Sequence, residues 1–520
     1  MSHVSRRCPV SKKVDVSDNR QVTSWIVSDL GGTDQLCPWV TIGALPDGVL
    51  LDIFEFYLDL EKSNSRVYRY HEDAWQGLVH VCKRWRDIVF ASPHRLRLRL
   101  VCTNKRPVHK LLEVWPGMPI VIRSCPGMSK PQDANNIIAA LKQHDRVCEI
   151  DINGWVDDIP NSVLIKICAM EMRDPFLALT YLRLLSKDED GPVLSDSLLG
   201  GSAPRLQTLY LRGLPFPALP NLLLSTRDLV RLTIQINPLS GYLSPAAMVT
   251  CLSALTRLKR LSLVLQSPRS RAVRETRLLP RLTHVVLSTL TTFIFRGDSE
   301  YFEDIVAKID TPLLTGLTLM SFNQLIFDTP RLRYFISRTE AFKSPHKASI
   351  VFNNFDVVVN LFRRDGSRMD EERVFWLEIP CRPLDWQLSS IVQVCMSALS
   401  PLPTLECLEI ISCRDHRQDD VEDTQWLEVL HLFTSVKNLV LSEILSLPVA
   451  ASLEKLSGEN ATEVLPTLQN LFLQVPHSSK PIEQAIGKYI TARQLSGCPA
   501  TVYNWDSGSE KYVRWDVGDR

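Results

Sequence analysis

Hydrophobic positions in the first part of the chain predict two short amphipathic helices. Between Ala44 and Leu60, apolar residues recur at three- and four-residue intervals, which places them on one face of a helix. The segment Ala74–Phe90 has a similar spacing, with basic residues and an aspartate on its opposite face. Isolated helices of this length are marginal in water, so both apolar faces need a packing partner.

Further along the chain, aliphatic residues recur at positions i, i+3 and i+5. The last two members of each triplet lie two residues apart, so they point to the same side of a strand. One such unit cannot cover its apolar face, but stacked neighbours bury a continuous core. The triplets are Val147-Ile150-Ile152, Leu179-Leu182-Leu184, Leu206-Leu209-Leu211, Leu229-Leu232-Ile234, Leu258-Leu261-Leu263, Leu282-Val285-Leu287, Leu314-Leu317-Leu319, Leu332-Phe335, Val374-Leu377-Ile379, Leu405-Leu408-Ile410, Val436-Leu439-Leu441 and Leu468-Leu471-Leu473.

The triplets resemble leucine-rich repeats, whose LxxLxL core is one strand of a curved solenoid. Helices are expected between the strands, for example at Pro245–Leu258 and Ser299–Asp310. Pro-x-Leu steps such as Pro330-Arg331-Leu332 are expected where a helix gives way to a strand, because the residue before proline resists the helix. Most repeats lack the asparagine of the standard pattern, so we expect an irregular solenoid. A general leucine-rich α/β domain is the alternative.

Less regular segments flank and interrupt the repeats. The run His94–Cys102 alternates leucine with arginine and predicts a half-buried strand, and Pro119–Ser124 predicts a second one. The segment Phe342–Arg373 predicts an atypical repeat followed by a charged loop. An amphipathic helix around Ile482–Ile490 and a short hairpin after it predict a cap on the last repeat.

The amino-terminal helices carry the residues of a known motif. The start Leu45-Pro46, followed by Val-Leu and Ile-Phe, and the later run Val81-Cys82-Lys83-Arg84-Trp85 resemble the F-box, the adaptor-binding module of SCF-type ubiquitin ligases. A box followed by an irregular solenoid is similar to the F-box-like proteins of mushroom-forming fungi. The sequence departs from the compact motif at Glu61–Asp73, which is inserted between its halves. An ordinary helical hairpin that caps a larger domain is the alternative.

The resemblance implies a substrate-recognition subunit of a cullin-based ubiquitin ligase. The box would bind a Skp-family adaptor and the solenoid a target protein, so the chain would act by proximity and catalyse nothing itself. A leucine-rich-repeat scaffold with a vestigial box is the alternative function. The residues expected to contact the adaptor are Leu45, Pro46, Val49, Leu50, Ile53, Phe54, Leu78, Val81, Cys82 and Trp85.

On a solenoid strand, the residues between the leucines face the concave surface, where a target would bind. This placement puts Tyr210, Arg231, Arg260 and His284 on that surface. The two arginines and the histidine come from three consecutive triplets, which suggests a site for an acidic or phosphorylated segment. An ordinary polar surface is the alternative.

These patterns together predict an α/β chain, with an F-box-like helical module followed by an irregular leucine-rich-repeat solenoid. We expect a flexible leader at 1–40, the helical domain at 41–93, the solenoid at 94–480 and a carboxy-terminal cap at 481–520. A length of 520 residues fits such a repeat array, and 45% hydrophobic with 22% charged residues fits a soluble globular protein.

The charge balance and the cysteines indicate which classes of partner and which cellular compartment to expect. The 59 basic and 58 acidic residues balance, which gives no general field for nucleic acid. No apolar run is long enough for a membrane helix, and no secretory signal opens the chain. The 13 scattered cysteines lack a Cys-x-x-Cys pair, which predicts a reducing compartment, cytoplasmic or nuclear, and no zinc or other metal site.

The common catalytic motifs are missing from the sequence. It contains no phosphate-binding GxxxxGK[ST] or GxGxxG loop, no GxSxG elbow and no HExxH helix. We therefore expect no enzyme, no catalytic residues and no cofactor. A hydrolase remains as a third class, since a Cys-His or Ser-His pair assembled only in the folded chain leaves no local motif.

Overall fold

The chain divides into two compact units. Unit 1 comprises Met1–Tyr68 and Gln76–Leu96, and unit 2 comprises Arg69–Trp75 and Arg97–Arg520. Most of the predicted helical domain falls in unit 1, but its residues 69–75 belong to unit 2, and the first residues of the predicted solenoid, 94–96, belong to unit 1. The structure, a computed structural model, describes residues 42–64, 74–93, 95–103, 108–115, 117–124, 131–153, 170, 172–186, 193–236, 243–265, 284–321, 329–364, 371–399, 404–414, 423–456, 458–474, 480–506 and 511–515.

The helices of unit 1 pack through one stripe of α1. This helix, Asp47–Asn64, follows a short 3₁₀ turn at Ile42–Ala44 and has proline directly before its first residue. Its buried side chains lie at four-residue intervals, and the ring of Phe54 lies 4.7 Å from that of Trp85 on α3, measured between centroids. The buried residues of this core include Leu50, Phe54, Leu58, Leu78, Ile88 and Val89.

The second predicted helix is broken in two, so the prediction of one continuous helix is wrong. Its parts are α2, Ala74–Val79, and α3, Lys83–Ala91. Between them Cys82 is extended, with φ −158° and ψ 170°, and its Sγ accepts a hydrogen bond from the backbone N–H of Trp85 at 3.5 Å. The Nε of Arg86 donates to the carbonyl of Val79 at 3.0 Å, which satisfies a carbonyl at the end of α2.

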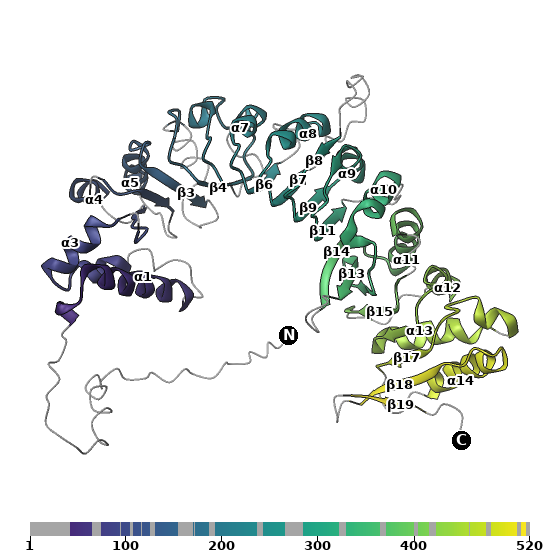
Figure 1. The fold of residues 1–520 in the computed structure, drawn as a ribbon. Coiled ribbons are helices and arrows are strands. Elements are labelled where there is room, and N and C mark those ends of the chain that lie inside the picture. Colours follow the sequence, from purple (N-terminus) through teal and green to yellow (C-terminus); the bar gives the residue numbers. More distant parts are fainter. Residues whose placement is uncertain are drawn as a thin grey trace, which may run out of the picture. The chain divides into compact units, whose positions relative to one another are not determined.

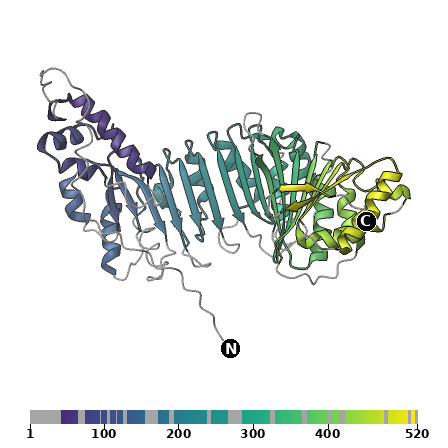
Figure 2. The same cartoon turned by 90° about the horizontal axis from the view of Figure 1, so that it is seen from below.

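Unit 2 is built on a sheet of 17 strands among the described residues (Figures 1 and 2). Its first strands, each parallel to the next, form a continuous ladder. This confirms a mixed α/β fold with a long parallel sheet. These strands are β1 (Leu100–Thr103), β2 (Ile120–Arg123), β3 (Val147–Asn153), β4 (Tyr181–Leu185), β5 (Thr208–Arg212), β6 (Arg231–Ile236), β7 (Arg260–Leu265), β9 (Thr292–Gly297) and β11 (Gly316–Ser321).

Helices cover one face of this sheet, and Figure 1 shows them together on the same side of the strands. We call the opposite face of the sheet the open face. The helices are α4 (Val108–Val114), α5 (Pro131–Leu141), α7 (Leu219–Ser225), α8 (Pro245–Ala254), α9 (Ser299–Val306), α10 (Pro330–Arg338), α11 (Leu384–Val394), α12 (Asp423–His431), α13 (Glu443–Glu454) and α14 (Lys480–Leu495). Shorter helical turns lie at Leu198–Gly201, Glu340–Phe342, Cys395–Leu399 and Gly458–Thr462.

The core of unit 2 lies between the helices and the sheet. Residues from successive triplets stand in register there, for example Leu209 beside Leu232 and Leu232 beside Leu261. These three side chains are almost completely buried. Most triplets therefore mark strands as predicted, and each strand buries its apolar side against those of its neighbours.

The triplet at 282–287 does not mark a strand of the main ladder. Residue 282 lies outside the described residues, and the rest forms the two-residue strand β8, Val285–Val286, which pairs with β10, Ile309–Asp310. The strand beside β7 is β9, whose buried Phe293 and Phe295 take the positions of the leucines. The triplet pattern did not predict this strand, because phenylalanines occupy the positions where the pattern expects aliphatic residues.

Leu332 and Phe335 lie on a helix, which corrects the prediction of a degenerate strand. Pro330 opens α10 at its first turn, where a missing N–H costs nothing. The buried carboxylate of Glu303 accepts from the backbone N–H groups of Arg331 at 2.8 Å and Leu332 at 2.7 Å. A spacing of three residues fits a helix as well as a triplet. The carboxylate of Glu303 stabilises the helix, because it satisfies N–H groups of its first turn.

The run His94–Cys102 becomes a strand only from Leu100, so the longer predicted strand is wrong. Arg97 has φ 50°, the left-handed region, within a turn at residues 95–97. Leu96 and Leu98 are nevertheless buried, like Leu100. Their burial explains the alternating pattern, although the backbone of this segment is not extended.

The atypical repeat is an antiparallel meander of three strands. These are β12 (Lys347–Phe352), β13 (Asp356–Arg364) and β14 (Glu371–Pro380). The last of them, β14, pairs in parallel with β11, and the first, β12, pairs in parallel with β15, Cys407–Ser412. The predicted charged loop is therefore partly strand, and its residues 365–370 lie outside the described residues.

Parallel pairing resumes after the meander and reaches the predicted cap. β15 is followed by β16 (Asn438–Leu441), β17 (Asn470–Leu473) and β18 (Thr501–Asp506), and β19 (Lys511–Arg514) closes an antiparallel hairpin with β18. The hairpin thus continues the sheet, and α14 supplies the expected last helix. On the open face, Asn470 donates to the side chain of Asn438 at 2.8 Å.

Candidate functional site

The first candidate surface lies on α1, which is apolar on two sides. One side packs into unit 1. The other carries Val49, Ile53 and Phe56, spaced by four and three residues, and these side chains are 41%, 38% and 66% exposed. We call these three residues the α1 apolar stripe. A row of exposed apolar side chains on a short helical unit is typical of an interaction surface.

The residues predicted to contact an adaptor separate into two groups. Pro46, Val49, Ile53, Val81 and Cys82 are exposed, and Leu45 and Trp85 are partly exposed. The prediction is wrong for Leu50, Phe54 and Leu78, because these three are buried inside the unit. Neighbouring positions on a helix point in directions about 100° apart, so both groups belong to one sequence motif but only one is accessible.

Sequence reasoning missed Phe56 and two other exposed apolar residues, Ile42 at 53% and Tyr57 at 39%. The signal was present, since the segment from Val49 to Leu60 is apolar on more than one side. A helix that needs only one packing face does not show this pattern.

An arginine of the motif connects α3 to the start of α1. The guanidinium of Arg84, on α3, donates to the Oδ1 of Asp47 from Nη2 at 2.5 Å and from Nε at 3.1 Å. The same Nη2 donates to the carbonyl of Leu45 at 2.6 Å. Arg95 forms a second ion pair, with Asp52. These contacts hold the start of α1 beside α3, which orients the α1 apolar stripe.

The second candidate surface is the open face of unit 2, where the structure brings two predicted residues together. Arg231 of β6 and Arg260 of β7 are direct partners in the parallel ladder, and both are exposed. Tyr210 lies on β5 in register with Thr233 of β6, and the guanidinium of Arg183 stands 5.4 Å from its ring centroid.

His284 does not join these residues, which corrects the predicted site of three consecutive repeats. It directly precedes β8, a strand outside the main ladder, and its Nδ1 lies 3.6 Å from the Oδ2 of Asp310. The neighbour of Arg260 in the next strand is instead Thr292.

Several other charges on the open face are paired with opposite charges. Arg183 Nη1 lies 3.4 Å from Asp151 Oδ2, and Arg99 forms an ion pair with Glu149. Beside them, burial and then the carboxylate of Asp151 raise the pKa of Tyr181. The ammonium of Lys347, on β12, contacts the carboxylates of Glu371 on β14 and Glu409 on β15.

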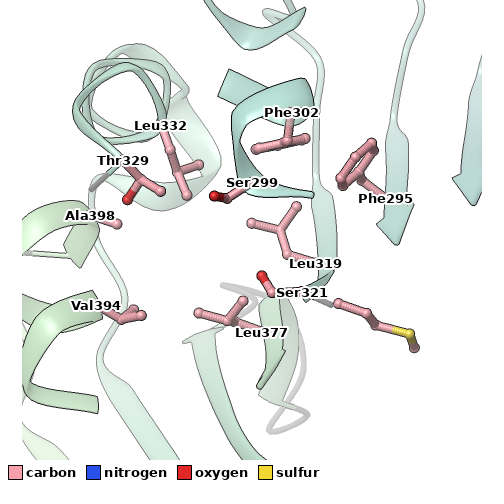
Figure 3. Close-up of a pocket in the computed structure, with 11 residues that line it drawn as sticks. Phe295, Ser299, Phe302, Leu319, Ser321, Thr329, Leu332, Leu377, Val394 and Ala398 are labelled. Atoms are coloured by element: carbon pink, nitrogen blue, oxygen red, sulfur yellow. The ribbon is translucent and has the colours of Figure 1, made fainter. Parts of the chain in front are cut away.

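A small pocket lies between the sheet and the helices of unit 2 (Figure 3). Its walls come from β9, β11 and β14 on one side and from α9, α10 and α11 on the other. Phe295, Phe302 and Leu319 make it mainly apolar, and its polar atoms are hydroxyls such as those of Ser299 and Ser321. Among the described residues that line it, none has a carboxylate, an imidazole, an amine or a thiol.

The described part of the chain offers neither a metal site nor a membrane-spanning helix. Within it, no cluster of three or more histidine, cysteine, aspartate or glutamate side chains is arranged to hold a metal ion. Among the same residues, no helix combines the length and the apolar character required to cross a bilayer.

Comparison with known proteins identifies no family for this chain. No family model and no curated protein matches the chain. Among solved structures, it is similar to the leucine-rich repeat-containing protein LegL7 from Legionella pneumophila, with 14% sequence identity over 69% of this chain and 92% of that one and a TM-score of 0.22. Similarity at this level supports no conclusion about function, so we base the architecture on the strand pairings themselves.

Proposed function

We propose that this protein is the substrate-recognition subunit of an SCF-type, cullin-based ubiquitin ligase. Unit 1 binds a Skp-family adaptor through the α1 apolar stripe and the residues around it, and unit 2 binds the target protein. The observation that carries the proposal is the stripe itself, an accessible apolar surface on the helix that follows the F-box-like start Leu45-Pro46.

The energetics of such an interface suit the stripe. Burial of one aliphatic or phenylalanine side chain contributes about 1.5–3 kcal/mol by area transfer. A few well-packed anchors usually dominate the affinity of a protein interface, and aromatic side chains are frequent among them. Phe56, at 66% exposed, has the most accessible area of the stripe to lose on binding.

The chain contributes proximity in this proposal and no chemistry of its own. A ligase of this kind brings a target close to a charged conjugating enzyme, and orientation alone accelerates such a transfer. The proposal places the protein in the cytoplasm or the nucleus. Nine cysteines of the described residues are free thiols, in keeping with a reducing compartment.

A leucine-rich-repeat scaffold with a vestigial box is the second candidate, and the insertion favours it. α1 continues to Asn64, so the first part of the Glu61–Asp73 insertion lengthens this helix. Residues 65–73, the remainder of the insertion, lie outside the described residues. A lengthened α1 departs from the compact box.

Co-purification with a Skp-family adaptor tests the proposal. We expect the double variant Val49→Glu with Ile53→Glu to weaken adaptor binding at least about tenfold, because it places two charges in a desolvated interface. Both residues are exposed, so unit 1 should still fold. The control is Leu447→Glu, at an apolar residue 47% exposed on α13 of unit 2.

Two results would count against the proposal. Undiminished adaptor binding by the double variant would exclude the α1 apolar stripe as the contact surface. Failure of the unaltered chain to bind any adaptor would favour the scaffold with a vestigial box.

A further inference from the structure

The pair Arg231 and Arg260 is unusual on the open face. Their Cα atoms are partners in adjacent parallel strands, about 4.8 Å apart. Within the described part of the chain, neither guanidinium has a hydrogen bond or an ion pair with a carboxylate. Like charges directly opposite each other on neighbouring strands destabilise a sheet. Other cations of this face, such as Arg183 and Lys347, do have carboxylate partners.

The surroundings of the pair are basic as well. The four adjacent strands β5, β6, β7 and β9 carry one arginine each and no acidic residue. The strand neighbours of the pair are Thr208 on β5 and Thr292 on β9. Arg212 and Arg296 follow these threonines by four residues, which is about 13 Å along the strands. We call the four arginines of these strands the arginine patch. Its residues are Arg212, Arg231, Arg260 and Arg296.

Neutral hydrogen-bonding groups lie between the two ends of the patch. Tyr210, Thr233 and Ser262 are in register on β5, β6 and β7, each between two buried residues of its strand, and all three are partly exposed. Their hydroxyls can donate to or accept from a peptide backbone. An extended segment that runs along the strands would therefore meet guanidinium groups at positions about four residues apart and hydroxyls between them.

Acidic residues lie one strand beyond the patch on each side, past β4 and past β11. Asp151 and Glu149 lie on β3, and Glu378 lies on β14. Burial raises the pKa of Glu378, the charge of Asp356 raises it further, and Arg296 lowers it. A long polyanion such as a nucleic acid would meet these carboxylates as it left the patch. A short acidic segment of a protein would not.

We propose that Arg231 and Arg260 together bind an oxyanion, a carboxylate or a phosphate, in a short acidic segment of the target protein. Paired guanidinium groups suit either anion, because each offers two parallel N–H donors. The proposal rests on the proposed role of unit 2 as the target-binding unit, and it is independent of the adaptor surface on unit 1.

Fluorescence anisotropy on the full-length chain tests the proposal with defined probes. The probes are a short glycine-serine peptide with several glutamates, the same peptide with phosphoserines, its glutamine counterpart, and an oligothymidylate of matched charge. We expect the glutamate or the phosphoserine peptide to bind and the glutamine peptide not to bind. Whichever of the two binds more tightly identifies the anion, and affinity should fall as salt increases.

The deciding variant is Arg231→Gln with Arg260→Gln, which keeps polar side chains on the strands. We expect it to weaken binding of the acidic peptide at least about tenfold, the scale of a lost charge-assisted hydrogen bond. The matched control, Arg205→Gln with Arg227→Gln, removes the same charge from exposed turns before β5 and β6 and should change affinity less than twofold.

Three outcomes would overturn the proposal. These are no binding of either acidic peptide, equal weakening by the control variant, and tighter binding of the oligothymidylate than of both peptides. Adaptor co-purification with the Arg231→Gln, Arg260→Gln protein is measured in parallel. If the unaltered chain binds the adaptor but neither acidic peptide, this inference fails while the ligase proposal stands; if the chain binds an acidic peptide but no adaptor, the ligase proposal fails instead.

Discussion

A single buried arginine organises the last repeat of unit 2. Arg493, on α14, is 1% exposed and has no carboxylate partner among the described residues. Its guanidinium instead donates to a set of backbone carbonyls and to one phenolic oxygen. The acceptors are the carbonyls of Ala461, Leu465, Pro466, Leu468 and Cys498, and the hydroxyl of Tyr489. Burial raises the pKa of that tyrosine, and the nearby guanidinium lowers it.

Replacement of this arginine should destabilise the end of the solenoid. We expect Arg493→Met to lower the free energy of unfolding by about 3 kcal/mol, because several buried carbonyls lose their donors. Urea unfolding followed by circular dichroism measures the change. The control is Gln494→Met, an exposed neighbour on the same helix. Equal stability of the two variants would show that solvent replaces the guanidinium without cost.

At the scale of elements, the short helix α3 of unit 1 has at its N-cap a cysteine whose thiol can be labelled chemically. Cys82, the residue that caps α3, is exposed and is one of the residues expected to face the adaptor. Cys413, on unit 2, is also exposed. Cys395 is buried, and its burial raises the pKa of the thiol to about 12. The three thiols therefore differ in accessibility.

Alkylation of the folded chain should follow these differences. We expect iodoacetamide near neutral pH to modify Cys82 and Cys413 but not Cys395, because only an accessible thiolate reacts. A bound Skp-family adaptor should protect Cys82 and leave Cys413 unaffected. Mass spectrometry of the digested protein measures both effects. Equal modification of Cys82 with and without bound adaptor would contradict the proposed contact surface.

Elements with a regular period could be predicted from the sequence, and elements that depend on tertiary contacts could not. The parallel strands follow from buried leucines such as Leu209 and Leu232, since stacking alone requires them. α10 depends on a cap from Glu303, which is distant in sequence. The break before α3 depends on the extended backbone of Cys82, and alternation of apolar residues cannot reveal it.

The candidate sites were predicted in part for the same reason. The motif that begins at Leu45 indicated the correct helix, but only the folded unit separates buried Phe54 from exposed Phe56. Register placed Arg231 beside Arg260 as expected. The triplet pattern placed His284 on the strand after β7, because the pattern includes only aliphatic residues. The strand after β7 is β9, whose core residues are phenylalanines.

At the scale of the whole molecule, the boundary between the units runs through a helix. Trp75 is part of unit 2, whereas α2 continues into unit 1 from Gln76. The indole of Trp75 is buried, lies edge-on to Trp115 at 5.8 Å between centroids, and donates from Nε1 to the carbonyl of Arg99 at 3.2 Å. Unit 2 therefore includes a residue from within the motif that resembles an F-box.

Loss of this indole should weaken the first strands of unit 2. We expect Trp75→Ala to destabilise them by about 3–5 kcal/mol, the usual cost of truncating a buried tryptophan. Hydrogen exchange of the β1 and β2 amides measures the effect. The control is Trp386→Ala, at a tryptophan that is 50% exposed on α11. Unchanged exchange of β1 and β2 would show that these strands do not depend on Trp75.

The meander has a consequence for the order in which a ribosome can complete this protein. The partner of β11 is β14, which emerges only after β12 and β13 have been synthesised. Until then β11 is an uncovered edge of a growing sheet, and such edges recruit other chains. β12 meanwhile waits for β15. During synthesis β11 therefore stays uncovered for longer than strands whose partner follows next in the chain, which extends the time in which this edge can recruit another chain.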